Sequence, residues 1–226
     1  MPTILVIDDD TAIRKLLGVA LNAAGFTTIL TDKGINGLAQ AATHNPSLIL
    51  LDLGLPDIEG RHLLQKLREW SNTPVIVLSA REAEHEKIMA LEAGADDYLT
   101  KPFSVGELIA RIKSCLRRVD MLTPSSNPII ISDNLHLNAL SHTVTLSNIP
   151  LKLTPKEFEL LRLLMQNSGK VLTHTWLLKE IWGIVYQSET HYLRVFINQL
   201  RQKIEVDPAR PKRIITETGI GYRFMG

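Results

Sequence analysis

Short apolar runs alternate with amphipathic segments along the first 118 residues of this 226-residue chain. Two of the runs, SLILLD and PVIVL, are apolar almost throughout, as expected of central parallel strands covered on both faces. The segments between the runs repeat apolar residues every three or four positions, which predicts helices with one buried face. The predicted strands are 3–7, 27–30, 48–53, 74–78 and 97–99, and the predicted helices are 11–24, 33–44, 60–70, 82–93 and 104–117. Five βα units with short connections predict a doubly wound, five-stranded parallel α/β sheet.

The pattern changes after residue 118. Residues 119–128, VDMLTPSSNP, are rich in proline and serine and predict a linker. The alternating runs of 129–153 predict an antiparallel meander. Helices are predicted at 155–167, 174–182 and 190–205, followed by a terminal β-hairpin with glycines at its turn. The sequence therefore predicts two domains, 1–118 and 129–226, the second of them α+β.

Charge also separates the two halves. Residues 1–120 hold 13 basic and 16 acidic side chains, whereas residues 121–226 hold 12 basic and 8 acidic ones. An acidic first half and a basic second half indicate two tasks, the second involving a polyanion, although ordinary surface variation gives such differences as well. A single cysteine, Cys115, favours a reducing compartment. Since no apolar run approaches the roughly 20 residues of a membrane span and the N-terminus does not resemble a signal peptide, we expect a cytoplasmic protein with no membrane partner.

Polar side chains that could build one phosphate site follow four of the predicted strands. Asp8 and Asp9 come after TILVI, Asp52 after SLILL, Ser79 after PVIVL and Lys101 after DDYLT. The carboxyl ends of parallel strands lie along one edge, and open α/β sheets bind their ligands there. Taken singly, an aspartate at such a place commonly caps a helix and a lysine is commonly solvated. Their joint position at strand ends favours a common site.

Three carboxylates, a hydroxyl and a lysine suit Mg²⁺ and a phosphoryl group. Mg²⁺ takes oxygen ligands and usually needs only one or two carboxylates beside phosphate oxygens and water. Asp9 and Asp52 can supply these, with Asp8 as a direct or water-mediated third ligand. Asp52 ends the central strand and is the best candidate for a carboxylate that accepts phosphate. Ser79 could then hydrogen-bond a phosphoryl oxygen, and Lys101 could balance its charge.

Residues 1–118 resemble the receiver domain of two-component response regulators. The resemblance rests on IDDD at 7–10, LDLGLPDIEG at 51–60, LSAR at 78–81 and GADDYLTKPF at 94–103. It implies a regulator, not an enzyme, in which Asp52 accepts phosphate from a sensor histidine kinase. It further implies that Mg²⁺ is held by Asp9, Asp52 and the backbone carbonyl of Gly54. The implied switch moves Ser79 toward the phosphoryl group and turns Tyr98 inward.

Residues 82–118 also resemble the dimer face of the winged-helix (OmpR/PhoB-like) subfamily. Oppositely charged side chains there could pair between two receivers, which implies a homodimer promoted by phosphorylation. Within one chain such charges are commonly solvated, and an exposed pair adds roughly 0–1 kcal/mol. The implied pairs are Lys87 with Glu107, Asp97 with Arg111 and Asp96 with Arg118, and the apolar patch between them is Ile88, Leu91 and Ile109.

The segment 191–205 has the composition of a DNA recognition helix. It places Leu193, Phe196, Ile197, Leu200 and Ile204 on one face. Arginine suits guanine or phosphate, asparagine and glutamine suit adenine, and lysine suits phosphate, although an ordinary solvated helix surface looks similar. The candidate DNA contacts are Arg194, Asn198, Gln199, Arg201 and Lys203 on this helix, and Tyr222 and Arg223 in the terminal hairpin.

The second half resembles the winged helix-turn-helix effector of the same subfamily. The motifs are LTPKEFELLRLL at 153–164, GKVLTHTWLLKEIW at 169–182 and TETGIGYRF at 216–224. The resemblance implies a transcription factor that binds double-stranded DNA and acts on RNA polymerase. Within the subfamily, LDLGLPD, PVIVLSAR and ITETGIGYRF are most similar to the Kdp-type regulators of potassium transport, although a different target operon stays open.

Two other classes of protein share parts of this pattern. An aspartyl phosphatase of the haloacid dehalogenase type needs Asp-x-Asp-x-Thr after its first strand. Asp8 and Asp10 fit that motif, but position 12 is alanine, and no cap domain fits between residues 11 and 47. A receiver fused to a protein-binding module is the other alternative, and failure to bind any duplex in a salt-sensitive way would support it.

Overall fold

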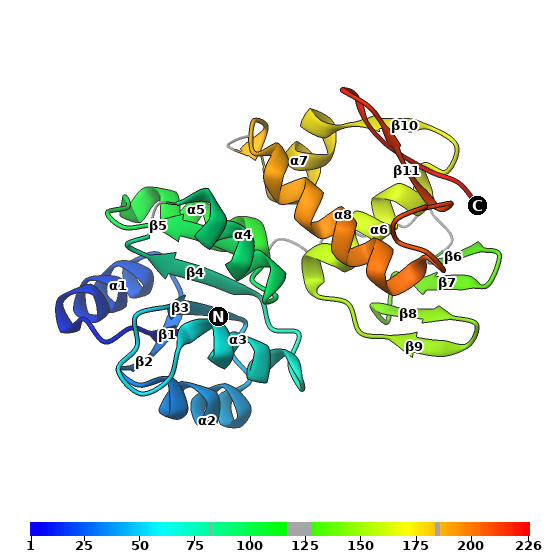
Figure 1. Cartoon of the computed structure of the whole chain (residues 1–226). Helices are drawn as coiled ribbons and strands as arrows, with labels where there is room; N and C mark the ends of the chain where they lie inside the picture. The colour runs from blue at the N-terminus through cyan, green and yellow to red at the C-terminus, as the bar shows by residue number, and fades with distance from the viewer. Residues whose placement is uncertain (82, 117–127, 184–185) are drawn as a thin grey trace. The chain divides into compact units, whose positions relative to one another are not determined.

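The computed structural model describes residues 1–81, 83–116, 128–183 and 186–226. It divides into two compact units, Met1–Met121 and Leu122–Gly226 (Figure 1). The predicted boundary after residue 118 and nearly all of the predicted linker, 119–128, fall outside the described residues. In the part of the chain that is described, every helix is too short or too polar to cross a membrane.

The N-terminal unit is a five-stranded parallel sheet with helices on both faces (Figure 1). The strand order is β2-β1-β3-β4-β5, so the direction of winding reverses between β1 and β3. The strands are β1 (Thr3–Ile7), β2 (Thr27–Thr31), β3 (Leu48–Asp52), β4 (Val75–Ser79) and β5 (Asp97–Thr100). The helices are α1 (Thr11–Ala23), α2 (Gly34–His44), α3 (Gly60–Arg68), α4 (Glu84–Glu92) and α5 (Val105–Leu116). The predicted doubly wound sheet is confirmed.

The two faces of this sheet have separate hydrophobic layers. Every residue of β3 and β4 is buried, because helices cover these central strands on both sides. On one face, Leu17 of α1 and Ile112 of α5 pack into the cluster that contains Val6. On the other face α2 approaches β1 so closely that a Cβ on Gly37 would lie 2.4 Å from Ile7 Cδ1. A side chain at position 37 would therefore force Ile7 to shift.

The C-terminal unit combines two antiparallel sheets with helices. One sheet has the order β6-β7-β8-β9, and the other has the order β10-β12-β11. Its strands are β6 (Ile129–Ser132), β7 (Leu135–Asn138), β8 (Thr143–Leu146), β9 (Ile149–Leu151), β10 (Val171–Thr173), β11 (Ile214–Glu217) and β12 (Gly221–Phe224), and its helices are α6 (Pro155–Gln166), α7 (His174–Trp182) and α8 (Thr190–Ile204). The winged-helix expectation is confirmed. Strand β10 was not predicted, because three residues are too few for a periodic signal.

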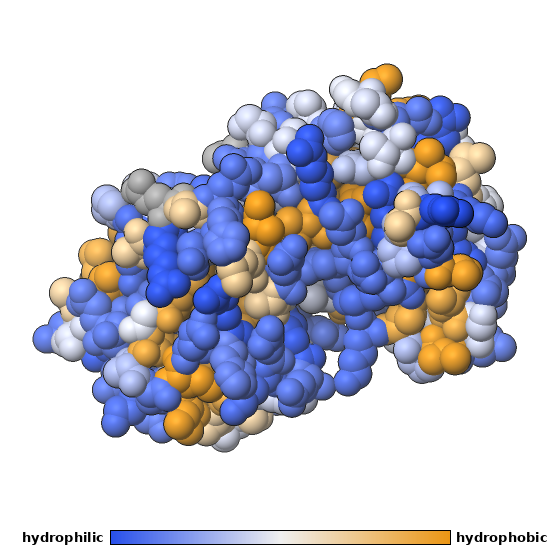
Figure 2. Space-filling model, viewed as in Figure 1, coloured by the Kyte–Doolittle hydropathy of each residue, from blue (hydrophilic) through white to orange (hydrophobic). Residues whose placement is uncertain are grey.

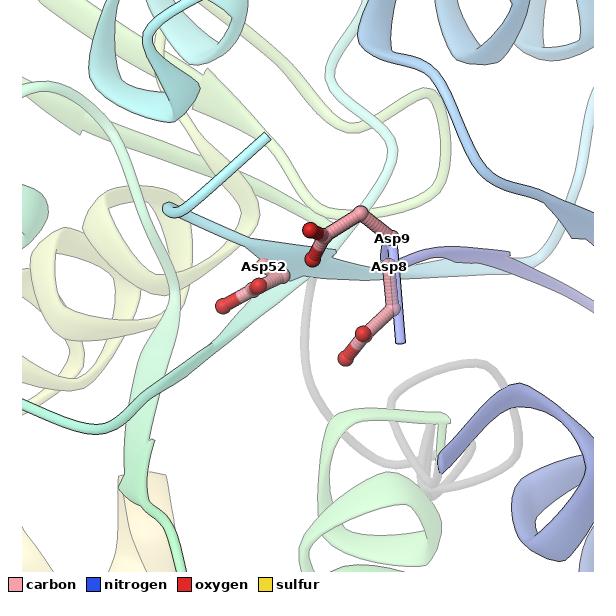
Figure 3. A group of neighbouring side chains, drawn as sticks. All are labelled: Asp8, Asp9 and Asp52. Atoms are coloured by element: carbon pink, nitrogen blue, oxygen red, sulfur yellow. The ribbon is translucent and has the colours of Figure 1, made fainter. Parts of the chain in front are cut away.

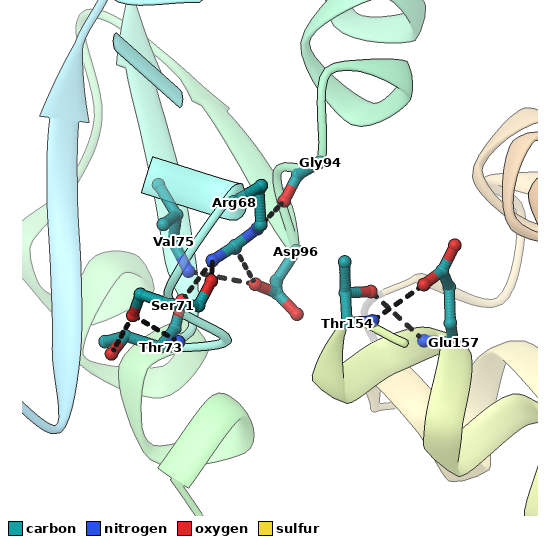
Figure 4. Close-up of polar contacts among 8 residues, drawn as sticks. All are labelled: Arg68, Ser71, Thr73, Val75, Gly94, Asp96, Thr154 and Glu157. Carbon is teal, nitrogen blue, oxygen red and sulfur yellow. Dashed lines mark hydrogen bonds and ion pairs between the residues drawn. The ribbon is translucent and has the colours of Figure 1, made fainter. Parts of the chain in front are cut away.

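Local signals start the helix α6 where the sequence predicts it. The Thr154 hydroxyl accepts from the Glu157 amide, while the Glu157 carboxylate accepts from the Thr154 amide at 2.7 Å (Figure 4). This capping box satisfies amides that the first helical turn leaves without partners.

Hydrophobic side chains also reach the surface of this unit over the four-stranded sheet (Figure 2), where Ile131 is 62% exposed. One face of an antiparallel sheet commonly stays open in this way.

Candidate functional site

Three carboxylates meet at the point where the winding of the parallel sheet reverses. Asp8 and Asp9 follow β1, Asp52 ends β3, and their ligand oxygens all lie within 4.8 Å of one another (Figure 3). Asp8 and Asp52 are buried, whereas Asp9 is exposed. The parallel strands therefore bring together side chains that are more than 40 positions apart in the sequence.

The ammonium group of Lys101 contacts two of the three carboxylates in this cluster. Its Nζ lies 2.8 Å from Asp8 Oδ2 and 3.3 Å from Asp52 Oδ1. Burial acts to lower the pKa of Lys101, but the contacts with Asp8 and Asp52 outweigh it and raise that pKa above its ordinary value. Burial raises the pKa of Asp52, and the charge of Asp8 adds to the rise although Lys101 opposes it. Lys101 thus offsets one of the negative charges of the cluster.

Asp8 is held at each of its oxygens. Its Oδ2 accepts a hydrogen bond from Lys101 Nζ, and its Oδ1 accepts one from the Asp10 amide at 2.9 Å. Its backbone carbonyl accepts from the Arg14 guanidinium at 2.6 Å. Asp10 in turn caps α1, and the amides of Ile13 and Ala12 lower its pKa. Sequence reasoning missed Arg14, although its place in the first turn of a helix that follows the acidic run was a usable signal. The turn that carries Asp9 is therefore rigidly supported on both sides.

Ser79 and Tyr98 meet at the loop that follows β4. Ser79 is 3% exposed, and its Oγ accepts from the Arg81 amide at 3.2 Å. Tyr98 is 2% exposed, and its hydroxyl donates to the Arg81 carbonyl at 2.7 Å. Burial raises the pKa of Tyr98. The Tyr98 ring thus lies inward in this structure, in the orientation that the resemblance associates with the switched state.

The loop after Asp52 is anchored from a distance. The two carboxylate oxygens of Asp57 accept from the amides of Gly34 and Ile35 at 2.9 Å each, and these amides lower the pKa of Asp57. This contact joins the loop that holds Gly54 to the start of α2. Gly54 itself is exposed next to Asp52, whose Oδ2 would lie 3.4 Å from a Cβ at that position. Sequence reasoning missed Asp57, since its partners precede it by more than 20 residues.

The donor set of the acidic cluster suits a hard divalent cation. Three carboxylates with one lysine leave an excess of negative charge in a largely buried place, which oxygen-seeking Mg²⁺ would neutralise. Asp9 is exposed, and in Figure 3 its carboxylate points toward Asp52. Asp9 and Asp52, with Asp8 beside them, are the carboxylates that could hold the ion. The pocket is thus consistent with a Mg²⁺ site.

The charged residues predicted for a dimer face mostly have partners within the chain. Asp96 is fully buried, and its Oδ2 accepts from Arg68 and from the Val75 amide at 2.9 Å each (Figure 4). Arg111 lies 3.2 Å from Asp97 and 2.6 Å from Glu107. Arg118, the predicted partner of Asp96, lies outside the described residues. The intermolecular pairs stay a prediction.

The apolar part of that predicted face is only partly accessible. Leu91 is fully buried in the receiver unit. Ile88 and Ile109 are half-buried, as is Lys87 on α4, and Ile109 also packs against the core cluster. Ile88 and Ile109 are therefore the apolar members that a partner could contact without rearrangement of the chain.

The predicted recognition helix, α8, buries one face and exposes part of the other. Leu193, Phe196 and Leu200 are at most 1% exposed, as the apolar spacing predicts. Arg194 and Asn198 are exposed on a common face, because residues four apart are neighbours on a helix. Gln199 is half-buried.

Other candidate DNA contacts are engaged inside the unit. Lys203 Nζ lies 2.7 Å from the buried carboxylate of Glu157. Arg201 donates to the Ile214 carbonyl at 2.7 Å. Tyr222 is 4% exposed, and Arg223 pairs with Glu217 at 2.6 Å. The structure thus separates two outward-facing residues of α8 from side chains that support the unit.

Comparison with known proteins agrees with this two-part organisation. The response regulator receiver domain family matches residues 4–113, and the family described as "transcriptional regulatory protein, C terminal" matches residues 148–224. The KDP operon transcriptional regulatory protein KdpE of Escherichia coli is 47% identical over 225 residues, which cover 100% of both chains.

Solved structures are similar along the whole chain. A mutant form of RitR is 27% identical with a TM-score of 0.83, and the comparison covers 100% of both chains. DrrB of Thermotoga maritima, an OmpR/PhoB homolog, is 33% identical with a TM-score of 0.53, again over 100% of both chains. The receiver implies a histidine kinase as its partner, and the winged helix implies DNA binding. The chain therefore belongs to the OmpR/PhoB-type two-component response regulators, a family of DNA-binding transcriptional regulators and not of enzymes, and is KdpE-like in sequence.

Proposed function

We propose that this protein is switched by phosphorylation of Asp52 and that it controls a potassium-transport operon. The observation that carries the first part is the position of Lys101 between Asp8 and Asp52, 3.3 Å from the acceptor carboxylate. The full-length identity of 47% to the KDP operon regulator KdpE supports the second part.

The pocket residues have distinct tasks in this proposal. A carboxylate oxygen of Asp52 attacks the phosphorus of a phosphohistidine, a P–O bond forms, the N–P bond breaks and the imidazole leaves with its electron pair. Mg²⁺, held by Asp9, Asp52 and the Gly54 carbonyl, would supply charge neutralisation for the transferred group. Lys101 stands ready to pair with a phosphoryl oxygen, and Asp8 keeps the lysine in place.

The output is proposed to follow through Ser79 and Tyr98. A phosphoryl group adds about −1.5 to −2 charge and strong acceptor oxygens, which the Ser79 hydroxyl can approach. Ser79 Oγ holds the Arg81 amide and Tyr98 holds the Arg81 carbonyl, so a shift of the hydroxyl changes the support of the loop before α4. This link supports a switch that alters the face formed by α4, β5 and α5.

We propose that this face forms the phosphorylation-dependent homodimer. Asp97 and Glu107 already pair with Arg111 in the same chain, so intermolecular pairs would replace existing ones. Such an exchange contributes little net free energy, and Ile88 and Ile109 would have to provide most of the attraction. The dimer would place two winged helices on a direct-repeat operator, where the regulator would contact RNA polymerase.

The direct test is the intact mass of the protein after incubation with Mg²⁺ and acetyl phosphate. Wild type should gain one labile phosphoryl group, and Asp52→Asn should gain none. Dimerisation and binding to duplexes from a potassium-transport promoter are then compared with and without the modification. A wild-type protein that stays unmodified with phosphohistidine donors as well would remove the switching proposal.

A further inference from the structure

The last turns of α8 hold the strand that enters the C-terminal hairpin. Arg201 Nε and one terminal nitrogen donate to the Ile214 carbonyl at 3.1 and 2.7 Å. The same terminal nitrogen lies 2.7 Å from Thr216 Oγ1. Arg201 therefore binds β11 at two alternate positions of the strand.

Glu205, one turn further along, binds the same strand through its amides. Its Oε1 accepts from the amides of Arg213 and Ile214 at 2.9 Å each, and its Oε2 accepts from the Lys212 amide at 3.0 Å. Glu205 is the C-cap residue that directly follows α8, and its side chain reaches the same segment as that of Arg201. Ile214 is thus held at its carbonyl by one and at its amide by the other.

This pair, Arg201 and Glu205, connects the helix to the whole hairpin. β11 pairs with β12 from Ile214↔Phe224 to Glu217↔Gly221. The Arg201 guanidinium also lies 5.9 Å from the centre of the Tyr222 ring on β12. Ile214 itself is fully buried, so the start of β11 is packed into the unit. Contacts with both strands therefore define the geometry between α8 and the hairpin.

Neither side chain suits direct contact with DNA in this arrangement. Arg201 already directs two of its nitrogens to acceptors in β11. Glu205 carries a negative charge in the basic unit, where it would repel a phosphate backbone. The negative charge of Glu205 thus opposes DNA binding. Its three hydrogen bonds to backbone amides at the start of the hairpin give it a structural role instead.

We infer that Arg201 and Glu205 are positioning residues that fix the angle between the recognition helix and the hairpin, so that both meet one duplex at the same time. The inference rests on the proposed DNA binding. A pre-set angle avoids the loss of conformational entropy that ordering the hairpin on DNA would otherwise cost. The gain in DNA affinity from the fixed angle should be largest on a duplex that contacts both α8 and the hairpin.

The test uses the full chain and two duplex probes of equal length, one selected by wild type from a random pool and one unselected. Glu205→Ala removes all the amide acceptors. Glu205→Gln removes the charge, keeps one oxygen as the acceptor for the Arg213 and Ile214 amides, and places an NH2 group where the Lys212 amide had its acceptor. Glu180→Ala, an exposed acid on α7, removes the same charge without touching the hairpin. Glu205→Ala should lower the preference for the selected duplex by about tenfold, the weight of one good base contact. Glu180→Ala should keep the wild-type preference, and Glu205→Gln, which retains two of the three amide contacts, should keep most of it.

The sign of the effect separates positioning from simple electrostatics. If Glu205 acts only through its charge, all three variants should bind both probes more tightly, and the inference is overturned. An unchanged preference in Glu205→Ala also overturns it. If wild type selects no duplex and binds none in a salt-sensitive way, the proposed DNA binding fails instead.

Arg201→Met tests the other half of the pair. It should lower the preference for the selected probe as Glu205→Ala does. Glu205→Ala should in addition speed hydrogen exchange at the Ile214 amide, which the carboxylate binds. A direct phosphate contact would instead weaken both probes equally and reduce the salt slope by about one. Should Glu205→Ala unfold at the assay temperature, Arg201→Met and Glu205→Gln provide the comparison.

Discussion

Lys101 and Asp8 form an ion pair of 2.8 Å in which the carboxylate is fully buried and the lysine is 17% exposed at its side chain. Removing one partner of such a pair leaves the other without compensation, whereas the pair itself is close to neutral in free energy. The relationship explains how a receiver keeps two buried aspartates next to each other. It also makes the lysine a determinant of stability.

Replacing Lys101 by methionine should lower the free energy of unfolding of the receiver unit by roughly 3 kcal/mol. Urea unfolding followed through the exchange of β1 and β3 amides measures this unit alone. Lys113→Met, at an exposed position of α5, is the matched control and should change stability by less than about 0.5 kcal/mol. Equal effects of the two substitutions would contradict the buried-pair account.

The stability of the receiver should fall as pH rises through the pKa of Asp52. That pKa is raised in the folded protein by burial, so between the unfolded value of about 3.9 and the folded value the native state binds the extra proton. Above the folded value the cost of the buried charge is fully present. Asp52→Asn should therefore melt higher than wild type near neutral pH, and the gap should close in acid. Melting curves in chelator from about pH 4 to about pH 8 measure it. A gap that widens in acid would refute the assignment.

Mg²⁺ should stabilise wild type more than Asp52→Asn or Asp9→Asn. At ten times the dissociation constant the ion adds about 1.4 kcal/mol to the folded state, because it binds that state alone. Melting temperature against Mg²⁺ concentration measures the effect, and chelator should reverse it. Asp57→Asn is included in the same Mg²⁺ titration. The Asp57 carboxylate lies outside the cluster and holds the loop that contains Gly54. The same response to Mg²⁺ in all variants would place the ion elsewhere.

Arg194 and Asn198 should carry the direct readout of α8. Replacement of either by alanine should cost about 1–3 kcal/mol on a selected duplex if it contacts a base edge, and should reduce the salt slope by about one if it contacts phosphate. Lys170→Ala, an exposed cation before β10, controls for the loss of positive charge. Titrations at several salt concentrations distinguish the cases. A loss no larger than that of the control would exclude both residues.

Lys203 should matter for stability more than for DNA. Its ammonium lies 2.7 Å from Glu157, which is 1% exposed and also part of the α6 capping box. Lys203→Met should therefore lower the free energy of unfolding of the C-terminal unit by about 2–3 kcal/mol, because it leaves a buried carboxylate unpaired. Urea unfolding measures this loss. Adding Glu157→Gln to that variant should recover part of the loss. A double variant as unstable as the sum of the single ones would show that the two do not interact.

Much of the fold follows from local patterns. Short apolar runs separated by helical periods were enough to predict the five parallel strands, and Thr154 with Glu157 was enough to predict the start of α6. β10 was missed because three residues between a helix and a turn have no periodicity of their own. The cluster of Asp8, Asp9 and Asp52 could be anticipated since parallel strands end at one edge.

The amino-acid order alone was sufficient to predict the layers, the acidic pocket and the apolar face of α8, since each depends on spacing along one element or on the common direction of parallel strands. The partners of charged side chains depend on elements far apart in the chain. Arg201 and Arg194 look equivalent in the helical sequence, yet one binds the strand that begins at Ile214 and the other faces solvent. Long flexible side chains take whichever acceptor the folded chain brings within reach, and no local pattern encodes that neighbour.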